Sequence, residues 1–70
     1  MNINWQRATM NIRQSGMSLQ AASKQIGANK NALAQLARGE INEPKFSQGI
    51  AILDLHLDMC GVDMTRELWL

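Results

Sequence analysis

Apolar residues recur at every third or fourth position in the first half of the chain, which is the spacing of one face of an α-helix. Two such stripes are present, made of Trp5, Ala8 and Ile12 and of Leu19, Ala22 and Ile26. Each stripe follows a residue type that commonly caps a helix, Asn4 or Ser18, and precedes a glycine that can end one, Gly16 or Gly27. The pattern predicts two short amphipathic helices joined by a tight turn.

A third helix is predicted over residues 29–38, with Asn29 as its N-cap and Gly39 just beyond its end. At about 100° per residue, Leu33 and Leu36 lie on one side of this helix. The opposite side carries a cation, two amides, an alanine and an arginine but no acid: Lys30, Asn31, Ala34, Gln35 and Arg38. Short helices joined by turns this tight must cross steeply, which is the geometry of a helix-turn-helix.

A longer fourth helix is predicted over residues 45–59. Its apolar stripe consists of Phe46, Ile50, Leu53 and Leu57. Residues 53–59 also alternate apolar and polar side chains, a period that suits a β-strand, so a strand there is the alternative. Neither glycine nor proline interrupts residues 50–60, which favours the helix.

With 70 residues, of which 46% are apolar, the chain can form one domain over residues 1–70 and no second core. A single cysteine cannot form an intramolecular disulfide, so we expect helix packing or self-association to supply the stability. The longest apolar run, residues 50–53, is far too short to cross a membrane, and the amino terminus does not resemble a signal peptide. We therefore expect a soluble, cytoplasmic protein without a membrane partner.

Charge is distributed unevenly, although the net charge is only +1. Residues 1–39 contain five basic residues and no acid, whereas residues 40–70 contain two basic and six acidic residues. A basic half without carboxylates suits a polyanion such as nucleic acid. Chance segregation of a few charges in a small chain is the alternative explanation.

The polar side of the third helix has the chemistry needed to contact DNA bases. Asn31 and Gln35 each offer a donor and an acceptor in one plane, which matches the adenine edge in the major groove. Lys30 can donate to guanine or to phosphate, and Ala32 or Ala34 can meet a thymine methyl group. An ordinary polar surface helix is the alternative.

Three segments together resemble the Cro/Xre family of phage repressors. Residues 16–40, GMSLQAASKQIGANKNALAQLARGE, resemble its helix-turn-helix, and NEPKFSQGIAIL resembles the segment in which a Pro-basic-Phe element touches the DNA backbone. GVDMTREL, residues 61–68, is similar to the short fifth helix of the family, with Asp63 as its cap. The resemblance implies an all-α, compact five-helix, lambda-repressor-like domain that binds double-stranded DNA. In some Cro proteins a C-terminal strand, here residues 53–59, mediates dimerisation.

The same resemblance implies a dimeric transcription regulator that represses a phage or prophage promoter at a near-palindromic operator. A phage-type activator that touches RNA polymerase, or an antitoxin or autoregulator whose acidic half binds another protein, is the alternative. Leu19 stands where the family often has a phosphate-contacting Gln, so this contact passes to Gln20 or to backbone amides. The expected phosphate contacts are Ser18, Gln20, Asn29, Arg38 and Lys45.

Residues 44–70 are expected to contribute the dimer contact as well. Apolar residues close to a chain terminus are the candidates: Leu57, Met64, Leu68 and Trp69. Alternatively, Trp69 folds back over the core of its own domain together with Trp5.

His56 and Cys60 are spaced as i and i+4, which could place two metal ligands or a base and a nucleophile on one helix face. The chain has no second histidine or cysteine, and no group is recognisable as an orienting partner. We therefore expect no metal, no cofactor and no catalytic residues, with Cys60 as a small buried side chain and His56 as an ordinary surface or interface residue.

Overall fold

Four α-helices make up most of residues 2–70, the part of the chain that the computed structural model describes. They are α1 (Trp5–Gln14), α2 (Leu19–Gln25), α3 (Ala32–Ala37) and α4 (Phe46–Arg66). The all-helical prediction is confirmed, and the alternative of a strand over residues 53–59 is wrong, because these residues lie within α4. Four helices replace the five expected, since α4 continues as far as Arg66. Its backbone is nevertheless non-helical at Gly61, where φ is 89° and ψ is 168°.

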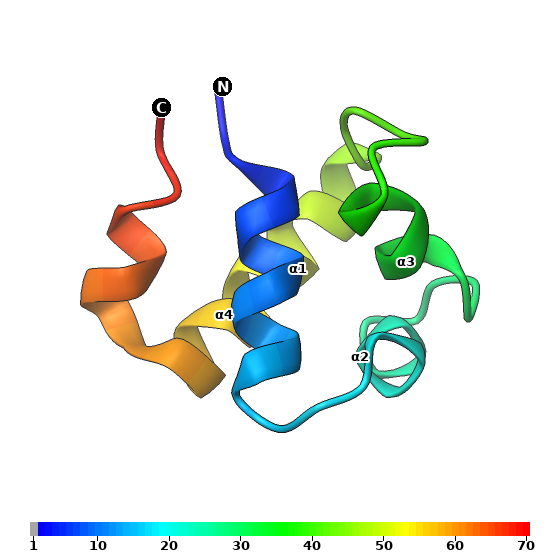
Figure 1. Ribbon diagram of the computed structural model, residues 1–70, viewed down its shortest axis with the longest axis horizontal. Coiled ribbons are helices and arrows are strands. Elements are labelled where there is room, and N and C mark those ends of the chain that lie inside the picture. The colour runs from blue at the N-terminus through cyan, green and yellow to red at the C-terminus, as the bar shows by residue number, and fades with distance from the viewer. Residues whose placement is uncertain (1) are drawn as a thin grey trace.

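Helix α1 is the centre of the packing and contacts each of the other three helices (Figure 1). It begins where the sequence predicts, because the Asn4 side chain accepts a hydrogen bond of 3.0 Å from the backbone N–H of Arg7. Its residues Ala8 and Ile12 are fully buried. Helix α4 crosses behind α1 in Figure 1, and α1 is the one helix of residues 2–70 that it packs against.

The side of α4 that faces α1 is not the apolar stripe identified in the sequence. Its buried residues are Gly49, Ile52, Leu55, His56 and Thr65. A Cβ atom on Gly49 would lie 3.1 Å from the ring of Trp5, so glycine allows Trp5 to approach the helix closely. Three residues of the predicted stripe are exposed, Phe46 by 77%, Ile50 by 50% and Leu57 by 41%, whereas Leu53 is partly buried and packs against the core. Helix α4 therefore carries apolar side chains beyond the face that α1 covers.

The carboxyl-terminal residues are held against the start of the chain. Leu68 is fully buried, and its carbonyl accepts a hydrogen bond of 2.8 Å from the backbone N–H of Asn4. The N–H of Leu70 donates to the carbonyl of Asn2 at 3.0 Å, and Ile3 and Trp69 form an isolated antiparallel bridge. These contacts join the two ends of the described chain, which lie side by side in Figure 1.

A buried histidine links α1 with the residues of α4 before and after the non-helical Gly61. The side chain of His56 is fully buried; its Nε2 lies 3.1 Å from the amide nitrogen of Asn11, and its Nδ1 lies 2.7 Å from the hydroxyl of Thr65. The Thr65 hydroxyl donates its proton to the carbonyl of Gly61 at 2.8 Å, so it must accept from Nδ1–H. Nε2 then accepts from Asn11. The network is satisfied by a neutral imidazole, and the expectation of a surface or interface histidine is wrong.

Acid should destabilise the fold through His56. Burial lowers the pKa of this side chain below 6.5 in the folded protein, and a proton on Nε2 would oppose the amide donor of Asn11. The unfolded chain therefore binds more protons as the pH falls below 6.5, so the free energy of unfolding should be constant above that pH and decline below it. Urea denaturation followed by circular dichroism between about pH 5 and 8, the interval in which a histidine side chain ordinarily changes its charge, would measure this.

The control for this prediction is His56→Gln, which removes the one histidine of the chain. Whatever its absolute stability, its free energy of unfolding should be nearly independent of pH over the same interval. Equal pH dependence in the two proteins would show that another group is responsible.

Candidate nucleic-acid interface

The turn between α2 and α3 is fixed by a buried serine. The Ser23 hydroxyl donates to the carbonyl of Leu19 at 2.8 Å and accepts a hydrogen bond of 3.1 Å from the backbone N–H of Leu33. Ser23 is fully buried, and Gly27 between the helices has a φ of 76°, as its predicted role in ending α2 requires. One side chain of α2 thus satisfies an N–H in the first turn of α3 and sets the position of that helix.

The third helix starts later than the sequence predicts, at Ala32 with Asn31 as its N-cap. Asn29, the predicted cap, accepts instead from the backbone N–H of Asn31 at 3.0 Å, only two residues along the chain. Its carbonyl accepts from the N–H of Ala32 at 2.9 Å. Because these bonds form a turn of the Asx type, Lys30 and Asn31 precede α3 rather than lie within it. The sequence predicts that these two residues lie on the polar side of a regular helix. This prediction is wrong, because they lie in the turn before the helix.

The predicted base-contacting residues differ in their exposure. Leu33 and Leu36 are buried, as expected. Lys30 and Asn31 are exposed, and Ala32, Ala34 and Gln35 are partly buried. Of the five, Lys30, Asn31 and Gln35 have polar groups, and we call these three the recognition surface. It combines one cation and two amides.

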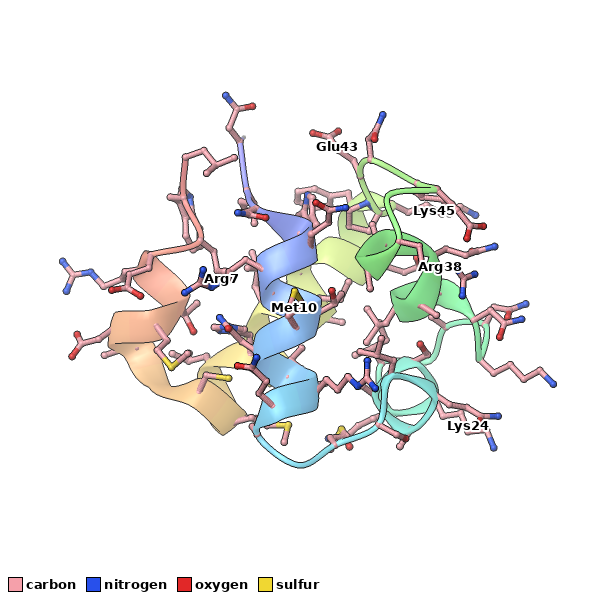
Figure 2. All side chains as sticks on the ribbon, viewed as in Figure 1. Arg7, Met10, Lys24, Arg38, Glu43 and Lys45 are labelled. Carbon is pink, nitrogen blue, oxygen red and sulfur yellow. The ribbon has the colours of Figure 1, made fainter. Side chains whose placement is uncertain are left out.

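Three basic side chains lie on the side of the molecule that carries α3. Figure 2 shows Lys24, Arg38 and Lys45 on the side of the molecule formed by α2, α3 and the loop after α3. Lys24 was not among the predicted contacts, although its place near the end of the second predicted helix could have suggested it. All five predicted phosphate contacts are exposed: Ser18, Gln20, Asn29, Arg38 and Lys45.

Two of these candidates already have partners within the chain. The Ser18 hydroxyl accepts from the N–H of Ala21 at 3.1 Å, which confirms its predicted role as the cap of α2. Arg38 forms an ion pair with Glu40, and both side chains are more than half exposed. Exposed pairs contribute little to stability, so a phosphate can compete with Glu40 for the guanidinium.

The residues expected to form a dimer contact do not all reach the surface. Leu57, Met64 and Trp69 are 41%, 39% and 48% exposed. Leu68 is fully buried within its own chain, which corrects its assignment to the interface. The reason is the pairing of the terminal segment with residues 2–4, which directs Leu68 into the core.

His56 and Cys60 do not form a reactive pair. Both ring nitrogens of His56 are engaged by Asn11 and Thr65. Burial raises the pKa of the Cys60 thiol, which lowers its thiolate fraction and its reactivity. His56 therefore belongs to the buried hydrogen-bond network, whereas Cys60 is a partly buried thiol on α4.

Comparison of the chain with models of known protein families, with curated proteins and with solved structures returned no match. Within residues 2–70, no helix is both long enough and apolar enough to cross a membrane. The candidate interface therefore stands on the geometry and chemistry described above.

Replacing Ser23 with alanine should destabilise the protein by roughly 1 to 3 kcal/mol, because the N–H of Leu33 would be left buried without an acceptor. Chemical denaturation would measure the loss. Ser47→Ala is the matched control, since Ser47 is exposed on α4 and should change stability by less than about 0.5 kcal/mol. Equal losses of stability in the two variants would contradict a stabilising role of the hydrogen bond between Ser23 and the N–H of Leu33.

Proposed function

We propose that the protein is a sequence-specific regulator of transcription that binds double-stranded DNA through the recognition surface and acts as a homodimer. The observation that carries this proposal is the exposure of Lys30 and Asn31 immediately before α3, a helix whose Leu33 and Leu36 are buried and whose Gln35 is partly exposed. Amide and ammonium groups can donate and accept hydrogen bonds at base edges in the major groove, and no carboxylate belongs to this surface.

The surrounding side chains support contacts with phosphate. Lys24, Arg38 and Lys45 are exposed on the side of the molecule formed by α2, α3 and the loop after α3, and exposed cations beside a recognition helix can fix the orientation of a protein on the duplex. The acidic residues lie mostly in α4 and beyond, where Asp54, Asp58, Asp63 and Glu67 are exposed. This separation gives the molecule one side suited to a polyanion and one suited to other contacts.

The proposed fold is the lambda-repressor-like helix-turn-helix domain. The α2–turn–α3 unit held by Ser23 and Gly27 supplies the motif. The non-helical Gly61 divides α4 into residues 46–60 and 62–66, so the second part can act as the short fifth helix of that fold. Repression follows in this proposal from dimers that occupy a near-palindromic promoter site, with two recognition surfaces in successive major grooves about 34 Å apart.

Selection of bound duplexes from a random DNA library would test the proposal directly. An enriched inverted repeat, with half-sites about one helical turn apart, is the expected result. Binding that shows no enrichment and only a strong dependence on salt would contradict sequence-specific recognition.

Asn31→Ala and Gln35→Ala should each weaken binding to the selected site by roughly 1 to 3 kcal/mol, because each removes a planar donor and acceptor pair. Binding to a random duplex of the same length should be nearly unchanged. Fluorescence anisotropy with both duplexes at one salt concentration would measure the difference. Equal losses on the two duplexes would exclude a role in reading bases.

Lys45→Ala should weaken binding to selected and random duplexes alike and reduce the slope of log affinity against log salt by about one unit, because one phosphate contact is lost. Arg66→Ala is the matched control: it removes an exposed cation at the other end of α4 and should leave the slope unchanged. If both substitutions change the slope equally, or if neither changes it, the prediction that Lys45 contacts a phosphate is wrong.

A further inference from the structure

Residues 62–70, which we call the C-terminal segment, follow the break in α4 at Gly61. The φ of 89° at Gly61 lies in the left-handed region that favours glycine, and a Cβ atom on this residue would meet no packed atom within 4 Å. Figure 1 shows the segment, in orange and red, on the opposite side of α1 from α2 and α3. Gly61 is therefore a point about which the segment can move without displacing α2 or α3.

Two side chains and two backbone hydrogen bonds hold the C-terminal segment in place. Thr65 and Leu68 are its buried residues. The N–H of Asn4 donates to the carbonyl of Leu68 at 2.8 Å, and the N–H of Leu70 donates to the carbonyl of Asn2 at 3.0 Å. Its other apolar side chains are exposed: Val62, Met64, Trp69 and Leu70. A segment with so few buried apolar groups opens at a lower free energy than the helices of the core.

The buried polar link between the segment and the helices is the contact of Thr65 with His56. The Thr65 hydroxyl accepts from Nδ1–H of the imidazole at 2.7 Å, while Nε2 accepts from Asn11 of α1. This pattern requires a neutral imidazole, because a proton on Nε2 would meet the amide donor of Asn11. When the segment moves away, Thr65 leaves the ring and water reaches Nδ1.

No counter-ion accompanies His56 in residues 2–70. On α1 the cations Arg7 and Arg13 are exposed, and no carboxylate forms an ion pair with the ring. The thiol of Cys60, one turn beyond His56, stays neutral because burial raises its pKa. The remaining charged groups of α4 and the segment are exposed: Asp54, Asp58, Asp63, Arg66 and Glu67. Rotation of the Asn11 amide would offer an oxygen to Nε2–H, but the charge of a protonated ring would stay buried, and water stabilises such a charge far better than the core does.

We propose that the C-terminal segment is a pH-sensitive latch, which opens about Gly61 when His56 takes up a proton and closes when His56 is neutral. Opening hydrates the imidazolium with the loss of one buried leucine and two backbone hydrogen bonds, whereas global unfolding exposes the entire core. Release of the segment is therefore a smaller change than unfolding that still brings water to the ring.

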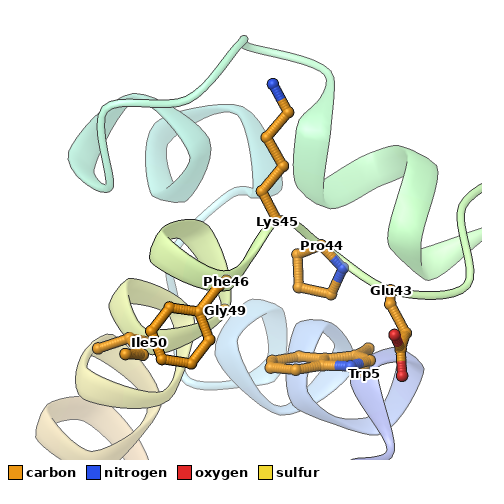
Figure 3. A pocket seen from close by; sticks show the side chains of 7 residues that line it. All are labelled: Trp5, Glu43, Pro44, Lys45, Phe46, Gly49 and Ile50. Atoms are coloured by element: carbon orange, nitrogen blue, oxygen red, sulfur yellow. The ribbon is translucent and has the colours of Figure 1, made fainter.

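The rest of the fold has contacts of its own that remain when the segment opens. Gly49, Ile52 and Leu55 of α4 are buried where this helix packs on α1. Figure 3 shows the ring of Trp5 close to Gly49 and Pro44, far from Gly61 along the helix. Helices α2 and α3 pack on α1 and on each other rather than on α4. The open state thus exposes the apolar surface that Leu68 covers, and DNA binding by the recognition surface is not required for the opening.

Hydrogen exchange of the full chain, followed residue by residue by NMR between about pH 5.5 and 7.5, tests this latch. The backbone N–H groups of Asn4, Leu68 and Leu70 report on the segment, and that of the fully buried Ile12 in α1 reports on global unfolding. After correction for the intrinsic exchange rate at each pH, the three segment amides should share a protection at least about ten-fold below that of Ile12. Their protection should fall by about five- to ten-fold from the higher to the lower pH, because the exposed ring takes up a proton with a pKa of about 6.5.

Two results on the wild-type protein would overturn the proposal. Segment amides whose corrected protection does not change with pH would show that these residues fray without exposing His56. Segment amides protected as strongly as Ile12 would show that the segment opens only when the whole protein unfolds. Both comparisons are made within one protein, so neither depends on the folding of a variant.

His56→Gln tests whether the histidine is the sensor. Glutamine can accept from Asn11 and donate to Thr65 but takes up no proton, so the protection of the segment amides should become independent of pH. Asp63→Asn is the matched control, since it removes an exposed titratable group of the segment itself and should leave the pH response unchanged. A pH response that survives in His56→Gln, or that disappears in Asp63→Asn, would assign the sensor to another group and overturn the proposal.

Discussion

Three parts of the chain depend on the hydrogen bonds of His56. The imidazole accepts from Asn11 of α1 and donates to Thr65, which in turn donates to the carbonyl of Gly61. The helix is interrupted at Gly61, and the segment beyond it is held by Leu68 in the apolar core and by this buried network. The network restricts how the segment can pack, because each buried polar group must find its partner. The last residues pair with the first in the resulting arrangement.

Much of the fold follows from local signals in the sequence. Asn4 and Ser18 cap the first two helices as expected, and Leu33 and Leu36 are buried as their spacing requires. These features depend on residues within one or two helical turns of one another. The later start of α3 was missed because Ser23 competes for the N–H of Leu33 from ten positions away, which no local pattern reveals.

The remaining differences arise from contacts between distant residues. Helix α4 has apolar residues on both sides, and periodicity alone cannot tell which side faces α1. The close approach of Trp5 to Gly49 places that side of the helix against α1, and Phe46, Ile50 and Leu57 remain exposed. The role of His56 was missed for the same reason, since Asn11 lies 45 positions away in the sequence. For the candidate interface, the residues remain a prediction from the sequence, and the structure adds the turn that contains Lys30 and Asn31 and the ion pair between Arg38 and Glu40.

The turn that precedes α3 has a consequence for how such a protein can change over evolutionary time. Lys30 and Asn31 are exposed, and α3 is positioned by Leu33, Leu36 and Ser23 from its other side. Substitutions of surface residues away from core contacts usually change stability by less than about 0.5 kcal/mol. New side chains can therefore be tried at positions 30 and 31 without an accompanying repair of the core. In a lineage carrying this scaffold, the surface chemistry at these two positions can change one residue at a time, each intermediate remaining folded.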